Sequence, residues 1–234
     1  MQIITEMAYP SAFSFKELND LRTYAAKKRY LESHLEKIGS GSSRIVYAVD
    51  DEKVIKLAKN RKGLAQNEVE ADKNTYYPAA PIDIFARVYD YDDGYYWIEM
   101  EVARKAKKSD IKSLYGVSFE LITDFIRKIY SIRGNDVYKY RHISPNTRNF
   151  DRFYDDYISA GDGEDTLWFE ISEKLYNFLN EIDEYIGMHT CNWTDVSDWM
   201  RLANWGIVTR NGEEHLVVVD NGLNDEIYKT HYSR

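Results

Sequence analysis

A glycine-containing turn between two β-prone runs, followed by a lysine on the second run, constrains the fold of this chain more than any other feature. The stretch reads Ile38-Gly39-Ser40-Gly41-Ser42-Ser43-Arg44-Ile45-Val46-Tyr47, then the acidic turn Asp50-Asp51, then Val54-Ile55-Lys56-Leu57. Glycine has no Cβ, so backbone N–H groups of a tight turn can approach the oxygens of a phosphate. The lysine adds a cation, so the pattern favours a nucleotide-phosphate site over its alternative, an ordinary glycine hairpin.

Length and charge narrow the class of protein. The 234 residues can build one sizeable core or two small lobes. A formal net charge of −8 disfavours a nucleic-acid partner, because binding phosphates needs a basic surface. The single cysteine rules out an intrachain disulfide, and no Cys/His spacing suits zinc. No apolar run approaches the ~20 residues that a bilayer requires, so we predict a cytoplasmic protein with no membrane partner.

Periodicity predicts the elements of the first half. The capping box Ser14-Phe15-Lys16-Glu17 and the apolar spacing after it predict one amphipathic helix over 14–37, ending before Gly39. A shorter helix is expected over 64–76, before two prolines. Runs 84–89 and 95–100, joined by Asp92-Asp93-Gly94, predict a β-hairpin.

The second half is predicted to be mainly helical. The basic segment 104–108 is expected to be a solvated linker, and its alternative is a contact with an anionic partner. Ser118 is expected to cap a helix with an apolar stripe. The polar stretch 131–165 carries no assignable chemistry. A long buried helix is expected over 167–186, and the Asn211-Gly212 turn predicts a hairpin with type I′ geometry. The fold class is therefore α+β.

This order of elements resembles the protein-kinase-like superfamily, and phage-encoded kinase-like proteins in particular, over residues 38 to 223. The closest motif matches are Gly39-x-Gly41-x-x-Arg44-x-Val46, Val54-Ile55-Lys56 and Asp220-Asn221-Gly222. The resemblance implies a two-lobed fold with an antiparallel-sheet N-lobe and a reduced, mainly helical C-lobe. Its implied boundaries are a helical extension over 1–37, an N-lobe over 38–103 and a C-lobe over 104–234.

The resemblance assigns ATP to residues of the first half. Lys56 would orient the phosphates and be paired by a glutamate of the following helix. Glu70 is favoured for this pairing because its separation from Lys56 is closer to that of the family, and Glu68 is the alternative. Further nucleotide contacts would come from the turn, the apolar wall and the linker backbone: Gly39, Ser40, Gly41, Ser42, Val46, Glu101 and Ala103, with Ile38 and Met100 beside the adenine.

The resemblance assigns metal and base to residues of the second half. Asp220, after a buried strand, and Asn204 would hold Mg²⁺. Asp198 would be the general base, with Asp195 as the fallback. Each of these residues has a plainer interpretation as a turn residue.

Three departures from the family pattern bear on activity. Arg44 replaces the third glycine of the loop. The triplet His-Arg-Asp is absent, and Asp198 stands one residue further from Asn204 than the pattern allows. Only 14 residues (234 − 220) follow Asp220 in this sequence, so we expect neither an activation segment nor the later C-lobe helices of the family.

We therefore expect an enzyme that is a Mg²⁺- and ATP-dependent kinase-like phosphotransferase acting on Ser/Thr hydroxyls of a protein. That protein would be a host protein in the host cytoplasm if the chain is phage-encoded. The alternative is a catalytically inactive pseudokinase that binds or inhibits a partner protein. Phosphorylation of a small molecule, as by antibiotic kinases, is less favoured because the sequence reveals no acidic pocket.

Overall fold

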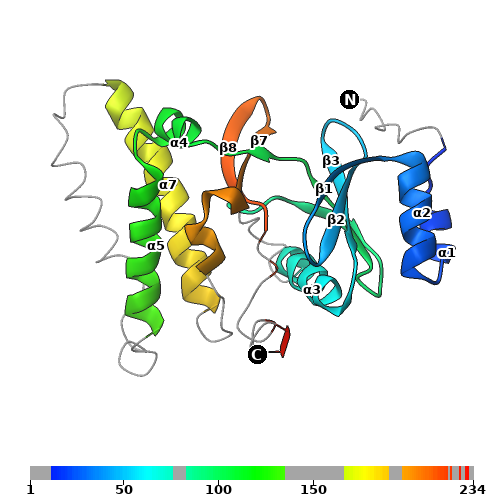
Figure 1. The fold of residues 1–234 in the computed structure, drawn as a ribbon. Coiled ribbons are helices and arrows are strands. Elements are labelled where there is room, and N and C mark those ends of the chain that lie inside the picture. Colours follow the sequence, from blue (N-terminus) through cyan, green and yellow to red (C-terminus); the bar gives the residue numbers. More distant parts are fainter. Residues whose placement is uncertain are drawn as a thin grey trace. The chain divides into compact units, whose positions relative to one another are not determined.

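The computed structural model describes residues 12–75, 83–134, 166–189 and 197–220, together with Gly222, Ile227, Thr230 and His231. The chain divides into two compact units, Met1–Ala79 with Ala86–Val102 and Ala80–Phe85 with Ala103–Arg234. Helices and antiparallel sheets make up both, which confirms the α+β prediction (Figure 1). Within the described residues, no helix is both long and apolar enough to span a bilayer.

The first unit contains a five-stranded antiparallel sheet in the order β1-β2-β3-β5-β4. Its strands are β1 (Glu36–Ser40), β2 (Arg44–Ala48), β3 (Lys53–Ala58), β4 (Val88–Tyr91) and β5 (Trp97–Glu101). Both hairpins of the first half are thus confirmed. The run predicted over 84–89 is shorter as a strand, because β4 starts at Val88, while Phe85 forms an isolated bridge with Val218 in the second unit.

The prediction of a single helix over 14–37 is wrong. Two helices replace it, α1 (Phe15–Asp20) and α2 (Tyr24–His34). Ser14 caps the first helix as predicted, but Leu21 leaves the helix with an extended backbone (φ −78°, ψ 122°). The Thr23 hydroxyl then accepts the N–H of Ala26 and starts the second helix, so local capping overrides a continuous apolar periodicity.

The two faces of the first sheet have different partners. Strand alternation directs one set of side chains toward a cluster shared with α1 and α2, comprising Ile45, Tyr47, Ile55, Leu57 and Trp97 with Phe13, Leu18, Leu31, Leu35 and Val49. Arg44, Val46 and Lys56 lie on the other face, where α3 (Arg61–Thr75) packs. Figure 1 shows α3 and the α1–α2 pair on different sides of the strands.

The second unit packs helices against a three-stranded antiparallel sheet in the order β6-β7-β8. Its elements are β6 (Arg104–Lys105), α4 (Lys108–Tyr115), α5 (Phe119–Gly134), α7 (Thr166–His189), the 3-10 helices η2 (Ser197–Met200) and η3 (Leu202–Asn204), β7 (Trp205–Arg210) and β8 (Glu213–Val218). The predicted β7–β8 turn is confirmed, with positive φ at both Asn211 (54°) and Gly212 (84°).

Two predictions for this unit need correction. Residues 104–108 are not a linker, because Arg104 and Lys105 pair with β7 and Lys108 starts α4. The long helix continues past the expected end at Gly187 to His189. The cap at Ser118 is confirmed, since its hydroxyl accepts the N–H of Leu121. The polar stretch 135–165, Asp195 and Asn221 lie outside the described residues.

Candidate functional site

A buried ion pair joins β3 to α3 in the first unit. The Lys56 ammonium lies 2.8 Å from Glu70 Oε2. The side chain of Glu70 has no exposed surface and that of Lys56 is 11% exposed. Glu68, the alternative partner, is exposed. Of the two glutamates, the structure therefore brings Glu70 to the lysine.

Arg44 supplies a second cation to the same carboxylate. Its Nη1 lies 2.8 Å from Glu70 Oε1, so each carboxylate oxygen has its own positive partner. Burial by itself raises the pKa of Glu70, but the charges of Arg44 and Lys56 outweigh burial and hold this pKa at about 2. Sequence reasoning treated Arg44 as a replaced glycine that stiffens or shields the phosphate site, and not as a partner of Glu70. The signal that it missed is Asn67, which stands one helical turn before Glu70 and also contacts Arg44.

The carbonyl groups of the glycine turn face the start of α3. The carbonyl of Gly41 accepts from Lys59 Nζ (2.7 Å), that of Ser42 from Asn60 Nδ2 (3.3 Å) and that of Ser43 from the Lys59 N–H (2.7 Å). In a trans peptide the C=O and the next N–H point in opposite directions. The N–H groups of Ser42 and Ser43 therefore point away from residues 59 and 60.

The two glycines have different surroundings. A Cβ added to Gly41 would meet no atom within 4 Å, whereas one on Gly39 would touch Val46 at 3.7 Å. Val46 lies directly opposite Lys56 in the β2–β3 register, and Met100 is buried on the same face. Ile38 falls at the register shift of β1 and is 52% exposed. Ser40 and Ser42 are exposed at the turn.

Glu101 and Ala103, which are expected to contact adenine, lie where the chain passes from the first unit to the second. Glu101 ends β5 and its N–H donates to the carbonyl of Arg87 (2.8 Å). Ala103 begins the second unit and lies so close to β7 that a Cβ on Gly206 would come within 2.6 Å of the Ala103 Cβ. The contact of Glu101 and Ala103 with adenine stays a prediction.

In the second unit, hydrogen bonds join Asn204 to Asp198 and to the residue before Asp220. The Val219 N–H donates to the carbonyl of Asn204 (2.9 Å), which places Asn204 beside the residue that precedes Asp220. The Asn204 Nδ2 donates to the carbonyl of Asp198 (2.9 Å). This bond uses the amide NH₂ group, and Oδ1 is the acceptor end of the same side chain. The Asp198 carboxylate lies 3.7 Å from the Arg201 guanidinium.

Two buried tryptophans hold this group in place. Trp199 and Trp205 are each at most 1% exposed, and the Trp205 indole N–H donates to the carbonyl of Trp199 (2.7 Å). Phe85 and Tyr185 pack against Trp199 at ring-centroid distances of 5.6 and 5.5 Å. Because Trp199 follows Asp198 and Trp205 follows Asn204, the aromatic core fixes both polar residues.

The oxygen donors of this group suit Mg²⁺. An amide oxygen from Asn204 and a carboxylate from Asp220 are hard ligands of the kind that this ion prefers, and it usually takes few protein ligands alongside waters and phosphates. The described part of the chain contains no cluster of three or more His, Cys, Asp or Glu side chains that could hold a metal ion.

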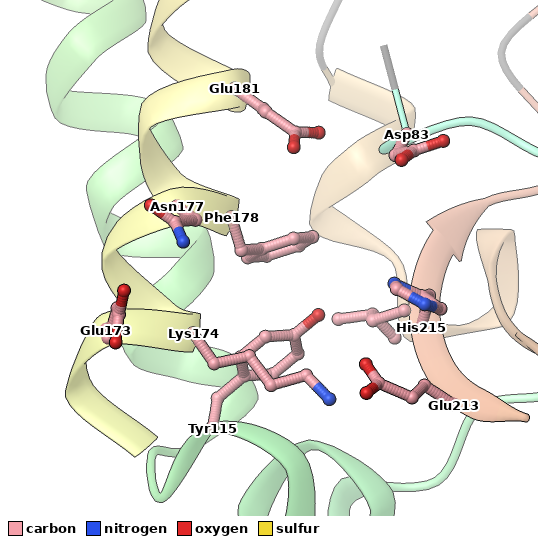
Figure 2. A pocket seen from close by; sticks show the side chains of 10 residues that line it. Asp83, Tyr115, Glu173, Lys174, Asn177, Phe178, Glu181, Glu213 and His215 are labelled. Atoms are coloured by element: carbon pink, nitrogen blue, oxygen red, sulfur yellow. The ribbon is translucent and has the colours of Figure 1, made fainter. Parts of the chain in front are cut away.

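A separate cavity of about 560 Å³ lies in the second unit (Figure 2). It is lined by Asp83, Tyr115, Glu173, Lys174, Asn177, Phe178, Glu181, Glu213, His215 and Leu216. Burial, followed by the charge of Asp83, raises the pKa of Glu181 to about 7. None of the predicted nucleotide, metal or catalytic residues lines this cavity. The sequence did not reveal it because its carboxylates come from well-separated segments.

Comparisons with known proteins add little. No model of a known protein family matches the chain, and no curated protein matches it. The structure of the streptomycin-ATP-APH(2")-IIa ternary complex is 13% identical over 86% of this chain and 71% of that chain, with a TM-score of 0.34. The GDP and kanamycin complex of APH(2")-IIia is 12% identical over 80% of this chain and 66% of that chain, with a TM-score of 0.30. Likenesses at this level carry no argument about the fold or activity of this chain.

Proposed function

We propose that the chain is a Mg²⁺- and ATP-dependent phosphotransferase with a compact, two-lobed kinase-like fold. The observation that carries the proposal is the buried pair of Lys56 and Glu70, which joins a central strand to a helix on the sheet face shared with Val46. A lysine held by a buried carboxylate keeps one orientation, so its ammonium is ready to bind the α- and β-phosphates of a nucleotide. Within the turn over Gly39–Ser42, the Ser42 N–H would bind the same phosphates, because the Gly41 N–H donates to the Arg44 carbonyl.

Phosphoryl transfer depends mainly on positioning and on neutralising charge. In the proposed roles, Asn204 and Asp220 hold Mg²⁺, and Asp198 accepts the proton of the attacking hydroxyl. When bound, the ion would neutralise phosphate oxygens. The bond from Asn204 Nδ2 to the Asp198 carbonyl supports this assignment, because it joins the proposed metal ligand directly to the proposed base.

We further propose that the accepting group is a Ser or Thr hydroxyl of a cytoplasmic protein. The second candidate is a binding module without catalysis, acting on a partner protein. It is favoured by the absent His-Arg-Asp triplet. The phosphotransferase and the binding module can both bind a nucleotide or a partner protein, but only the phosphotransferase transfers a phosphoryl group.

Nucleotide binding is tested by thermal unfolding with and without Mg²⁺ and ATP. A ligand present at 100 times its Kd stabilises the folded state by about 2.7 kcal/mol, so the melting temperature should rise. Lys56→Met should remove this rise. Lys53→Met is the matched control, because Lys53 lies on the same strand, three residues away and therefore on the opposite face. An equal rise in both variants would contradict the role of Lys56.

Transfer is tested with γ-labelled ATP and a cell lysate or a generic protein substrate. Asp220→Ala should abolish the label on protein while leaving the fold intact. Asp124→Ala, at an exposed position on α5, is the control and should keep the label. Comparison of Asp198→Ala with Asp195→Ala identifies the base by the larger loss of turnover. A rise in melting temperature without transfer would favour the binding module. If the melting temperature does not rise and no label is transferred, the proposed function is refuted.

A further inference from the structure

Arg44 contacts the same carboxylate as Lys56 but through the other oxygen. Its guanidinium is 2.8 Å from Glu70 Oε1, while the Lys56 ammonium is 2.8 Å from Oε2. Arg44 is 6% exposed and Glu70 1% exposed. The carboxylate is therefore held from two sides in a place with almost no access to water.

The guanidinium is itself held by a buried amide. Its Nη1 lies 3.4 Å from Asn67 Oδ1. The Asn67 Nδ2 donates to the carbonyl of Tyr95 (2.9 Å) and to that of Lys56 (3.4 Å), which fixes Oδ1 on the side of Arg44. Asn67 has no exposed surface. The carbonyl groups of Lys56 and Tyr95 thus orient Asn67, and Asn67 in turn orients the Arg44 guanidinium beside Glu70.

Hydrogen bonds and close packing fix the start of β2 and the residue before it. The Arg44 carbonyl accepts the Gly41 N–H (2.9 Å), and the Ser43 hydroxyl donates to Gln66 Oε1 (2.5 Å). At Gly63 the start of α3 comes so close that an added Cβ would lie 2.3 Å from the Ser43 carbonyl oxygen. The turn and α3 are therefore joined at several points besides the ion pair.

With Arg44 in place, Glu70 keeps a positive partner even when Lys56 binds another anion. A buried carboxylate is costly when its cation turns to another anion, because nothing then compensates its lost hydration. An arginine stays charged at all relevant pH values, and its planar group matches a carboxylate. Resting on the function proposed above, we propose that Arg44 is a positioning residue, which keeps Glu70 ionised and in place while the Lys56 ammonium binds phosphate.

The first test needs no nucleotide. The side-chain carboxyl of Glu70 is followed by ¹³C NMR over a pH titration in the wild type, Arg44→Gln and Arg210→Gln. Arg210 is the matched control, since it is equally buried but binds Asp83 and the Phe85 carbonyl in the second unit. Arg44→Gln should raise the Glu70 midpoint by roughly 1–3 pH units, the effect of losing a close opposite charge, and Arg210→Gln should not move it. An unchanged midpoint in Arg44→Gln overturns the proposal.

The second test measures turnover. Misplacement of the lysine should lower kcat about 10-fold or more in Arg44→Gln, and Arg44→Lys should recover part of it. Loss of ATP affinity in Arg44→Gln with an unchanged Glu70 midpoint would instead make Arg44 a direct phosphate ligand and overturn the proposal. If Arg44→Gln does not fold, Arg44→Lys decides, because a wild-type midpoint and kcat in that variant would show that the guanidinium contributes nothing. If the midpoint responds but the wild type neither binds nor uses ATP, the phosphotransferase function fails and the anchoring of Glu70 stands.

Discussion

Removing the charge of Glu70 should destabilise the first unit at neutral pH much more than at acidic pH. In Glu70→Gln, one end of the amide is an NH₂ group, so Lys56 or Arg44 would face a donor instead of an acceptor. The pKa of Glu70 falls from an ordinary value of 4.5 to about 2 on folding. At 1.36 kcal/mol per pH unit, ionised Glu70 then contributes about 3 kcal/mol of stability at pH 7. Loss of one partner of a buried ion pair typically costs a similar amount, about 3–5 kcal/mol.

The sign of the pH dependence follows from the lowered pKa. The contribution is complete above about pH 4.5, where the unfolded chain is also ionised, and is lost as the pH falls toward 2. By the same relation it is roughly 1.4 kcal/mol at pH 3. The difference in unfolding free energy between wild type and Glu70→Gln should therefore shrink by about 2 kcal/mol from pH 7 to pH 3.

Urea unfolding measured at each pH provides the assay. With 5-fluorotryptophan incorporated, the ¹⁹F signal of Trp97 reports on the first unit, because Trp97 is buried in the cluster that the sheet shares with α1 and α2. Glu68→Gln is the matched control, two residues away on the same helix but exposed, and should change stability by less than about 0.5 kcal/mol. A Glu70→Gln effect as small as that of Glu68→Gln, or one independent of pH, would refute the reasoning.

Two further predictions concern close packing and a raised pKa. Gly63→Ala should lower the melting temperature by several degrees, because the new Cβ would lie 2.3 Å from the Ser43 carbonyl oxygen and overpacking costs about 1–3 kcal/mol. Gly41→Ala, where the added Cβ meets open space, should keep the melting temperature and weaken ATP binding; the reverse pattern in calorimetry would contradict both assignments. Ionisation of Glu181, whose pKa is raised to about 7, opposes folding as the pH rises from 4.5 through 7, so Glu181→Gln should be more stable than the wild type at pH 8 and equal to it near pH 4. Urea midpoints at the two pH values check this, and an equal difference at both would rule it out.

Local patterns predicted most of the strands and turns. The β2–β3 and β4–β5 hairpins and the Asn211-Gly212 turn depend on residues only a few positions apart. Such features are set by backbone preferences that neighbours in the chain share. The family pattern likewise favoured Glu70 over Glu68, and in the structure Glu70 is the glutamate that meets Lys56.

Local patterns were insufficient where a nearby alternative competed with them. The apolar spacing through 14–37 suited one helix, yet Thr23 caps a second one. The basic run at 104–108 suited a linker, but the edge of β7 offered hydrogen bonds to Arg104 and Lys105. In both cases the deciding groups are backbone donors and acceptors that periodicity does not register.

The sequence by itself determined the β-hairpins and the tight turns, because each depends on steric and hydrogen-bonding preferences over a few residues. Only the tertiary structure decided that Arg44 and Lys56 share one buried carboxylate, and that the Asn204 carbonyl accepts the N–H of the residue before Asp220. These outcomes depend on distance in space and on exclusion of water. Both are properties of how helix and sheet pack in space.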